Sequence, residues 1–140
     1  MIVDSSALIA LIQREDTAAR IAEIMSTESA CRIGAPTWTE TLIVLMQRYG
    51  PVGRTVLERV RQEFGLAVID YTAEHAAIAV DAYARFGKGH HKAALNFGDC
   101  MTYAMARFST EPLVAVGDDF PHTDLVFASD SVVGRWPEHD

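Results

Sequence analysis

Acidic residues stand at places in this sequence where several carboxylates could act together on one ligand. One position directly follows the short apolar run Met1–Val3, and another follows Leu113–Val116 after a glycine. Two others lie near the start of segments with helical apolar spacing. Carboxylates brought together from separate segments repel one another unless a cation joins them, and an oxygen-only cluster suits Mg²⁺ or Mn²⁺. The candidate ligands are Asp4, Glu40, Asp99 and one of the pair Asp118 and Asp119.

Each of these acids also has an ordinary structural explanation. Asp4 could cap the helix that follows it, and Glu40 completes a capping box with Thr37. Asp99 suits the positive end of a helix dipole, and Asp118-Asp119 suits a turn. The setting of Asp4 between two apolar runs predicts partial burial, and a buried carboxylate needs a partner or a metal. From the residues alone, both interpretations stay open.

Short apolar runs alternate with helical patterns along the whole chain. Unalternating apolar strands separated by helices are typical of a mainly parallel sheet covered on both faces, in which ligands bind beyond the carboxyl ends of the strands. We therefore expect an α/β fold in one domain, residues 1–140, with a central sheet of four to five short strands flanked by helices. The expected strands are residues 1–3, 31–35, 66–69 and 113–116, with a further one at 125–128; the expected helices are about 7–12, 18–25, 36–49, 52–64, 72–86 and 99–108.

Composition excludes several classes of protein. The chain has 140 residues, of which 49% are hydrophobic, as expected for one globular domain. Cys31 and Cys100 are far apart, which excludes a disulfide framework and a CxxC metal site. No apolar run is long enough to span a membrane, and Asp4 precedes any basic residue, unlike a secretory leader. We expect a soluble cytoplasmic protein with no membrane partner.

The formal net charge of -7 is unevenly distributed. Residues 1–110 hold 12 acids and 11 bases, whereas residues 111–140 hold seven acids and one base. An acidic balance argues against a protein that simply coats a phosphate backbone. A basic segment lies between Asp81 and Asp99, and it could contact a polyanion or be an ordinary solvated loop. Its basic residues are Arg85, Lys88 and Lys92, with His90 and His91 among them.

The ordered set of motifs resembles the PIN-domain nucleases, and most of all the VapC toxins of bacterial VapBC toxin–antitoxin pairs. The resemblance rests on Met1-Ile2-Val3-Asp4-Ser5-Ser6-Ala7-Leu8, Pro36-Thr37-Trp38-Thr39-Glu40, Asn96-Phe97-Gly98-Asp99-Cys100 and Leu113-Val114-Ala115-Val116-Gly117-Asp118-Asp119-Phe120. Many relatives have Thr or Ser shortly before the fourth acid, where this chain has Val116-Gly117. Asp118 is favoured as the fourth acid, because Asp119-Phe120 looks like a separate structural pair.

The resemblance implies a PIN-like three-layer fold and a metal-dependent endoribonuclease. Asp4 and Asp99 would be the main ligands of Mg²⁺ or Mn²⁺, with Glu40 and Asp118 completing the site directly or through water. A water activated by the metal would attack the scissile phosphodiester. Ser6 could support the site by hydrogen bonding to a carboxylate or water, or it could cap the first helix.

The resemblance also implies partners. These would be RNA, a second copy of the chain in a homodimer, and a cognate VapB-type antitoxin that inhibits the enzyme with an Arg or Lys in the acidic pocket. Arg85, Lys88 and Lys92 are the expected RNA contacts, and the helices between Asp16 and Phe64 the expected antitoxin surface. Trp38 could stack on a base or pack in the core.

Two other functions fit parts of this pattern. A non-catalytic PIN-like module that binds RNA or protein would share the fold but fail to hold a metal. A phosphoacceptor receiver domain also has an acidic pocket in a parallel sheet, but it requires a lysine after a late strand and a more regular alternation, and neither is visible after Leu113–Val116.

Overall fold

The computed structural model describes residues 1–27 and 30–128. Helices and strands alternate through most of this range, and their positions agree with the sequence pattern to within a few residues. The strands are β1 (Ile2–Val3), β2 (Arg32–Gly34), β3 (Ala67–Ile69) and β4 (Leu113–Val114), and the helices are α1 (Ser5–Ile12), α2 (Ala18–Thr27), α3 (Ala35–Tyr49), α4 (Val52–Phe64), α5 (Ala73–Phe86), α6 (Phe97–Ser109) and the 3-10 helix η1 (Phe120–His122).

The strands form one parallel sheet in the order β3-β2-β1-β4. Ile2 lies opposite both Arg32 and Leu113, so β1 is a central strand although it opens the chain. The prediction of a mainly parallel sheet of four to five short strands is confirmed with four. Residues 125–128 pair with β4 through an isolated bridge between Leu113 and Phe127.

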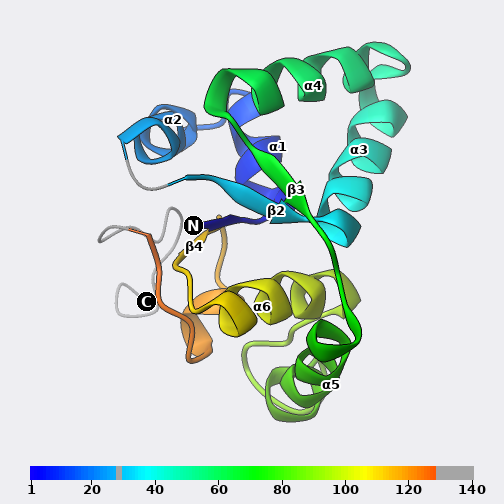
Figure 1. Ribbon diagram of the computed structural model, residues 1–140, viewed down its shortest axis with the longest axis vertical. Coiled ribbons are helices and arrows are strands. Elements are labelled where there is room, and N and C mark those ends of the chain that lie inside the picture. Colours follow the sequence, from blue (N-terminus) through cyan, green and yellow to red (C-terminus); the bar gives the residue numbers. More distant parts are fainter. Residues whose placement is uncertain (28–29, 129–140) are drawn as a thin grey trace.

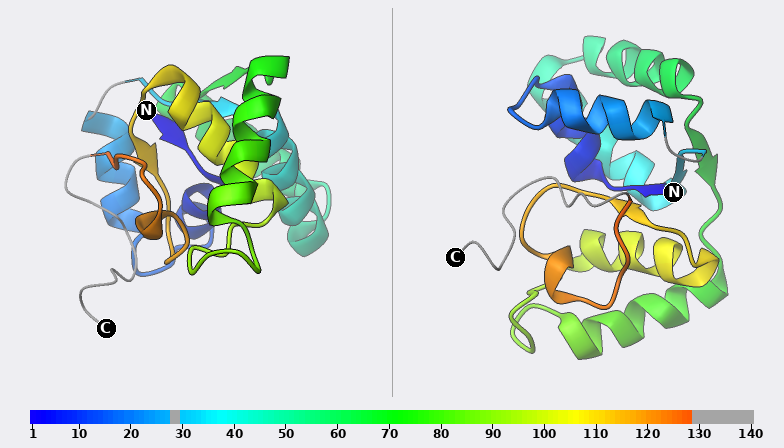
Figure 2. Two further views of the ribbon diagram at one scale, coloured as in Figure 1. Left: turned by 90° about the horizontal axis from the view of Figure 1, so that it is seen from below. Right: turned by 90° about the vertical axis from the view of Figure 1, so that its left-hand side faces the viewer.

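Helices cover both faces of the sheet and make three layers. Figure 1 shows α1 to α4 on one side of the strands and α5 and α6 on the other, and the side view in Figure 2 shows the same division. Neighbouring residues of β1 point to opposite faces, because side chains alternate along a strand. Val3 therefore packs in the core shared with α1 to α4, and Ile2 packs in the core shared with α5 and α6. No helix of the described residues is long and apolar enough to cross a membrane.

Local capping explains where the helices that carry the acids begin. Asp4 caps α1 by accepting a hydrogen bond from the backbone N–H of Ser6. Asn96 caps α6 in a reciprocal capping box with Asp99, so this helix begins at Phe97 and Asp99 is its third residue rather than its first.

Candidate active site

The acids expected from the sequence come from four parts of the fold that meet at one edge of the sheet. Asp4 directly follows β1, and Asp118 and Asp119 lie in the turn after β4, the strand beside it. Asp99 lies in the first turn of α6, and Glu40 in the second turn of α3. Parallel neighbouring strands end at the same edge, which is where ligands bind in open α/β sheets.

Asp4 is the most deeply held of these acids, with 4% of its surface exposed. Its Oδ2 accepts hydrogen bonds from the Ser6 backbone N–H at 3.0 Å and from Ser6 Oγ at 2.6 Å. Its Oδ1 accepts a bond from Thr102 Oγ1 at 2.6 Å. Since each carboxylate oxygen has two acceptor sites, Oδ1 keeps one for a further ligand. Asp4 is therefore a helix cap, and its buried carboxylate has hydrogen-bond partners on both oxygens.

Ser6 connects Asp4 to the end of β4. Its hydroxyl donates to Asp4 and accepts from the backbone N–H of Val116 at 2.9 Å. Of the two roles expected for Ser6, the contact with a site carboxylate is the one present.

A pair of buried threonines, which the sequence analysis missed, extends this network to the helix that carries Glu40. Thr102 Oγ1 and Thr37 Oγ1 lie 3.1 Å apart. The Thr102 proton is directed at Asp4, so Thr37 must be the donor within the pair. Thr102 follows Asp99 by three residues on α6, and this helical spacing to a site acid is the signal that could have revealed it.

Glu40 lies at the rim of the site, where its Oε1 accepts a hydrogen bond from Ser5 Oγ at 3.2 Å. Partial burial raises the pKa of the Glu40 carboxyl; the bond from Ser5 lowers it and the charge of Asp4 raises it further. The capping-box explanation does not apply to Glu40. The helix is capped at Gly34, and Thr37 lies inside it with its hydroxyl turned to Thr102.

Asp99 carries the largest electrostatic perturbation of the site. Burial raises the pKa of its carboxyl to about 7, opposed by the backbone N–H of Asn96 and reinforced by the charges of Asp4 and Asp119. A hydrogen bond between the Asp99 and Asp119 carboxyl groups adds to the increase in the pKa of Asp99. Asp99 therefore tends to keep a proton when these acids meet without a cation.

The fourth acid in contact with Asp99 is Asp119 rather than its neighbour. Burial raises the pKa of Asp119, while its hydrogen bond with Asp99 lowers it, and the charges of Asp118 and Asp4 raise it again. Asp118, the fourth acid expected from the sequence, is exposed, as is Asp119, and its charge raises the pKa of Asp119. Of the two aspartates in the turn after β4, Asp119 is the one that shifts the pKa of Asp99.

The donor chemistry fits a hard cation that retains much of its water. In the described part of the chain, no three His, Cys, Asp or Glu side chains are grouped closely enough to form a ready metal cage. Mg²⁺ is commonly bound by one or two carboxylates together with water and phosphate oxygens. Asp4 and Asp99 repel each other enough to raise the pKa of Asp99, and a cation between them would relieve that repulsion.

The three basic residues expected to contact RNA have different surroundings. Arg85 pairs with Asp81 and with Asp124, at 3.4 Å and 3.3 Å, and lies over the Phe86 ring. Lys88 and Lys92 are exposed in the loop between α5 and α6. The loop histidines also make ring contacts, His90 with Tyr83 and His91 with Phe86.

Other residues singled out in the sequence pack in the core or pair with neighbouring side chains. Trp38 is half-buried against the core beneath α3. Within the acidic C-terminal part, Glu111 pairs with Arg32, and Asp124 accepts a hydrogen bond from Tyr103 at 2.7 Å. The remaining charged residues of that part, Asp130, Arg135, Glu138 and Asp140, lie outside the described residues.

Comparison with known proteins identifies the family. Residues 1–125 match the PIN domain family model. The chain is 54% identical over 138 residues to Ribonuclease VapC36 of Mycobacterium tuberculosis, and the match covers 98% of each chain. It is 41% identical over 131 residues to Ribonuclease VapC28 of the same organism, covering 93% of this chain and 98% of the relative.

Solved structures share the fold. The crystal structure of Mycobacterium tuberculosis VapC20, described as a toxin that cleaves the sarcin-ricin loop, aligns with a TM-score of 0.72 at 20% identity, covering 89% of this chain and 95% of that one. VapBC2 from Rickettsia felis, bound to a DNA fragment from its promoter, aligns with a TM-score of 0.65 at 14% identity and covers 81% and 84%. These likenesses confirm the PIN-like α/β fold, and the sequence matches confirm the resemblance seen in the motifs. The chain therefore belongs to the PIN-domain family and, within it, to the VapC ribonucleases.

Proposed function

We propose that this VapC ribonuclease, the toxin of a VapBC toxin–antitoxin pair, cuts RNA internally at a divalent-cation site beside Asp4 and Asp99. The observation that carries the proposal is the convergence of Asp4, Asp99 and Asp119, in which burial and mutual repulsion raise the pKa of Asp99 to about 7. Ribonucleases of this family typically depend on a metal. Mg²⁺ or Mn²⁺ is the expected cation, and the unit that acts is a single domain, residues 1–140.

The residues of the chain would divide the work as follows. Asp4 is held by bonds from Ser6 and Thr102 and offers its remaining Oδ1 acceptor site as a fixed ligand. Asp99 would release its proton when a cation arrives, because a nearby positive charge favours the carboxylate. Glu40 and Asp119 would orient water around the cation and the phosphate. The bound cation would lower the pKa of a water molecule and polarise the scissile phosphodiester.

A cleavage assay tests this function directly. The purified chain should cut RNA with Mg²⁺ or Mn²⁺, and should stop cutting with EDTA or after Asp99→Asn. A non-catalytic RNA-binding module predicts the opposite result: RNA bound but intact under every metal condition. That result would reject the nuclease.

We assign RNA attraction chiefly to Lys88 and Lys92. Both are exposed on the loop before α6, whereas Arg85 is held in ion pairs. Counterion release from the phosphate backbone would supply the binding free energy, which makes binding dependent on salt. The cytoplasm is the expected place of action, because the RNA substrate is there.

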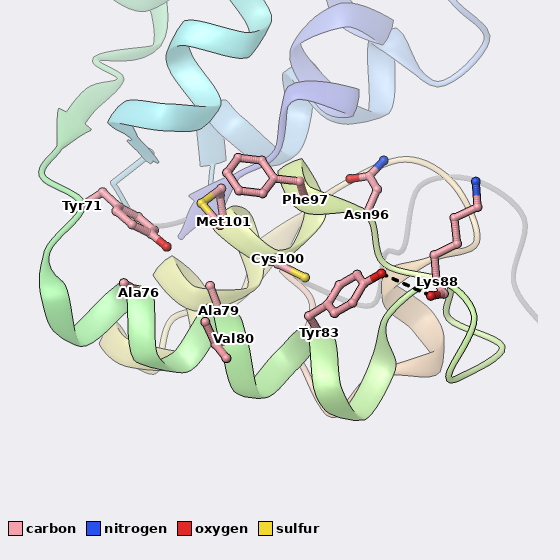
Figure 3. Close-up of a pocket in the computed structure, with 10 residues that line it drawn as sticks. All are labelled: Tyr71, Ala76, Ala79, Val80, Tyr83, Lys88, Asn96, Phe97, Cys100 and Met101. Carbon is pink, nitrogen blue, oxygen red and sulfur yellow. Dashed lines mark hydrogen bonds between the residues drawn. The ribbon is translucent and has the colours of Figure 1, made fainter.

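A second copy of the chain is the partner that we propose for the groove between α5 and α6. The groove has a volume of about 670 Å³, and Figure 3 shows apolar and aromatic side chains facing it from both helices. Val80 is 72% exposed and Phe97 is 78% exposed. Exposed apolar surface of this kind is typical of protein interfaces. If the groove forms a homodimer, Val80→Glu should convert the protein to monomers in light scattering; an unchanged mass would reject this interface.

A VapB-type antitoxin is the inhibitor that we propose, docked on α2 to α4. Structures titled as toxin–antitoxin complexes share the fold of this chain. Ile43, Tyr49 and Val52 are large apolar side chains exposed on α3 and α4. Ile43→Glu with Val52→Glu should weaken capture by the antitoxin while RNA cleavage persists. Unchanged capture would place the antitoxin elsewhere.

A further inference from the structure

Glu40 is exposed, and its carboxylate lies between the first turns of two other helices. Ser5, the first residue of α1, donates a hydrogen bond to its Oε1 at 3.2 Å. Gly98, the second residue of α6, lies against the other side of the same carboxylate. Three helices therefore meet at this group, and two of them present small residues to it.

Position 98 has no room for a side chain while Glu40 stays where it is. A β-carbon on Gly98 would stand 2.6 Å from Oε2, 3.1 Å from Oε1 and 3.2 Å from the carboxyl carbon. The first of these distances is far below van der Waals contact, which begins near 3.5 Å. Gly98 is not among the residues with positive φ, so backbone conformation does not require glycine at this place.

We propose that Gly98 is a positioning residue, whose missing side chain leaves the space that holds the Glu40 carboxylate beside Ser5 and within the electrostatic reach of Asp4. This inference rests on the proposed nuclease function. A pocket of about 280 Å³ borders this carboxylate on the side away from Asp4 and Asp99, which do not line it; Glu40, Gly98 and Thr37 do. A substrate or hydrated cation in the pocket would meet the carboxylate that Gly98 places there.

A methyl group at position 98 would displace the Glu40 carboxylate from its present place. Movement toward Asp4 would bring two carboxylates closer that already repel each other. Movement toward solvent would break the hydrogen bond from Ser5. Glu40 is long and flexible, so the side chain would move and the helices would stay. The consequence is a change of activity without loss of fold.

Gly98→Ala in the full chain is the test. The melting temperature should stay the same or rise, because alanine favours helix more than glycine does. The single-turnover cleavage rate should fall 10- to 100-fold with little change in the KM for RNA, and Mn²⁺ measured by calorimetry should bind more weakly. A crystal structure of this variant should show the Glu40 carboxylate displaced from Ser5.

Two background variants separate positioning from general damage. In the Glu40→Ala background, adding Gly98→Ala should lower the cleavage rate less than twofold, because no carboxylate remains to be displaced. In the Glu40→Asp background, the shorter side chain stays clear of the new methyl group. The loss of cleavage rate in the double variant should therefore be at least tenfold smaller than the product of the losses in the two single variants.

Clear outcomes would overturn the proposal. An unmoved Glu40 carboxylate in the Gly98→Ala crystal structure would do so, and so would an equal loss of rate in the Glu40→Ala background. If the wild-type chain cleaves no RNA with any metal, the nuclease function fails instead. The crystal structure of Gly98→Ala would still decide whether Gly98 positions Glu40.

Discussion

The hydroxyl of Thr102 donates a 2.6 Å hydrogen bond to Oδ1 of Asp4, a residue 98 positions earlier in the chain. Both residues are buried, and the Thr102 hydroxyl also accepts from Thr37. One hydroxyl thus joins the helices α3 and α6 to the acid that follows β1.

Replacing this hydroxyl should reduce both stability and activity. Thr102→Val keeps the side-chain shape but removes the hydroxyl. Oδ1 of Asp4 then loses this donor, and the hydroxyl of Thr37 loses its acceptor, both in a buried place. We expect the free energy of unfolding to fall by about 1 to 3 kcal/mol in urea titrations. We also expect at least tenfold slower cleavage, because Asp4 loses one of the bonds that orient it.

Thr39→Val is the matched control for this experiment. Thr39 is also on α3, but it is exposed and its hydroxyl bonds only to the carbonyl of Ala35, at 3.0 Å. This control should change the free energy of unfolding by less than about 0.5 kcal/mol. Equal effects of the two substitutions would show that the Thr102–Asp4 bond has no special role.

The raised pKa of Asp99 predicts how stability depends on pH. The folded pKa of about 7 lies above the ordinary value of 3.8, so between these pH values the folded chain holds more protons at this site than the unfolded chain. Stability of the metal-free protein should therefore decrease as pH rises from about 4 to about 7. One pKa unit corresponds to about 1.4 kcal/mol, and solvent screens part of the effect because Asp99 is only partly buried. We therefore expect a loss of about 1 to 4 kcal/mol from this group, measured by urea unfolding at several pH values.

Asp99→Asn supplies the control for that pH dependence. The amide does not ionise, so the variant should show a flatter pH profile and be more stable than wild type at pH 8 without metal. Mn²⁺ should stabilise wild type at pH 8 and have little effect on the variant. A steep profile that survives in Asp99→Asn would assign the titration to another group.

The two neighbouring aspartates after β4 should differ in their effects. Asp119 shares a hydrogen bond with Asp99, whereas Asp118 affects the site through its charge on Asp119. We expect Asp119→Asn to reduce the cleavage rate by about 100-fold or more, and Asp118→Asn by less than about tenfold. The two variants have the same charge and composition, so each is the control for the other. A larger loss in Asp118→Asn would restore Asp118 as the fourth acid.

Changing the basic residues should separate RNA binding from structure. Replacing Lys88 and Lys92 together by Gln should raise the KM for RNA and reduce the dependence of binding on salt by about one unit of slope for each lysine. Arg85→Gln should mainly lower stability, by about 0.2 to 1 kcal/mol, because it breaks exposed ion pairs with Asp81 and Asp124. If Arg85→Gln changes the salt slope as much as the lysine pair does, Arg85 also contacts RNA.

The positions of helices and strands could be predicted because their signals are local. Helical spacing and the Gly65 C-cap, with its left-handed φ of 62°, place α4 at Val52–Phe64 as expected. The contacts within the site could not be predicted in the same way, because they join residues far apart in sequence. The choice between Asp118 and Asp119 depends on how the turn after β4 directs each side chain. The space that Gly98 leaves matters only because Glu40 arrives there from another helix.

The strand order has a consequence for synthesis of the protein. β1 is made first, but it lies between β2 and β4, and β4 begins only at Leu113. A ribosome must therefore deliver more than a hundred residues before the edge that gathers Asp4, Asp99 and Asp119 can close. We therefore expect a nascent chain to gain this site, and any activity that depends on it, only when translation is nearly complete.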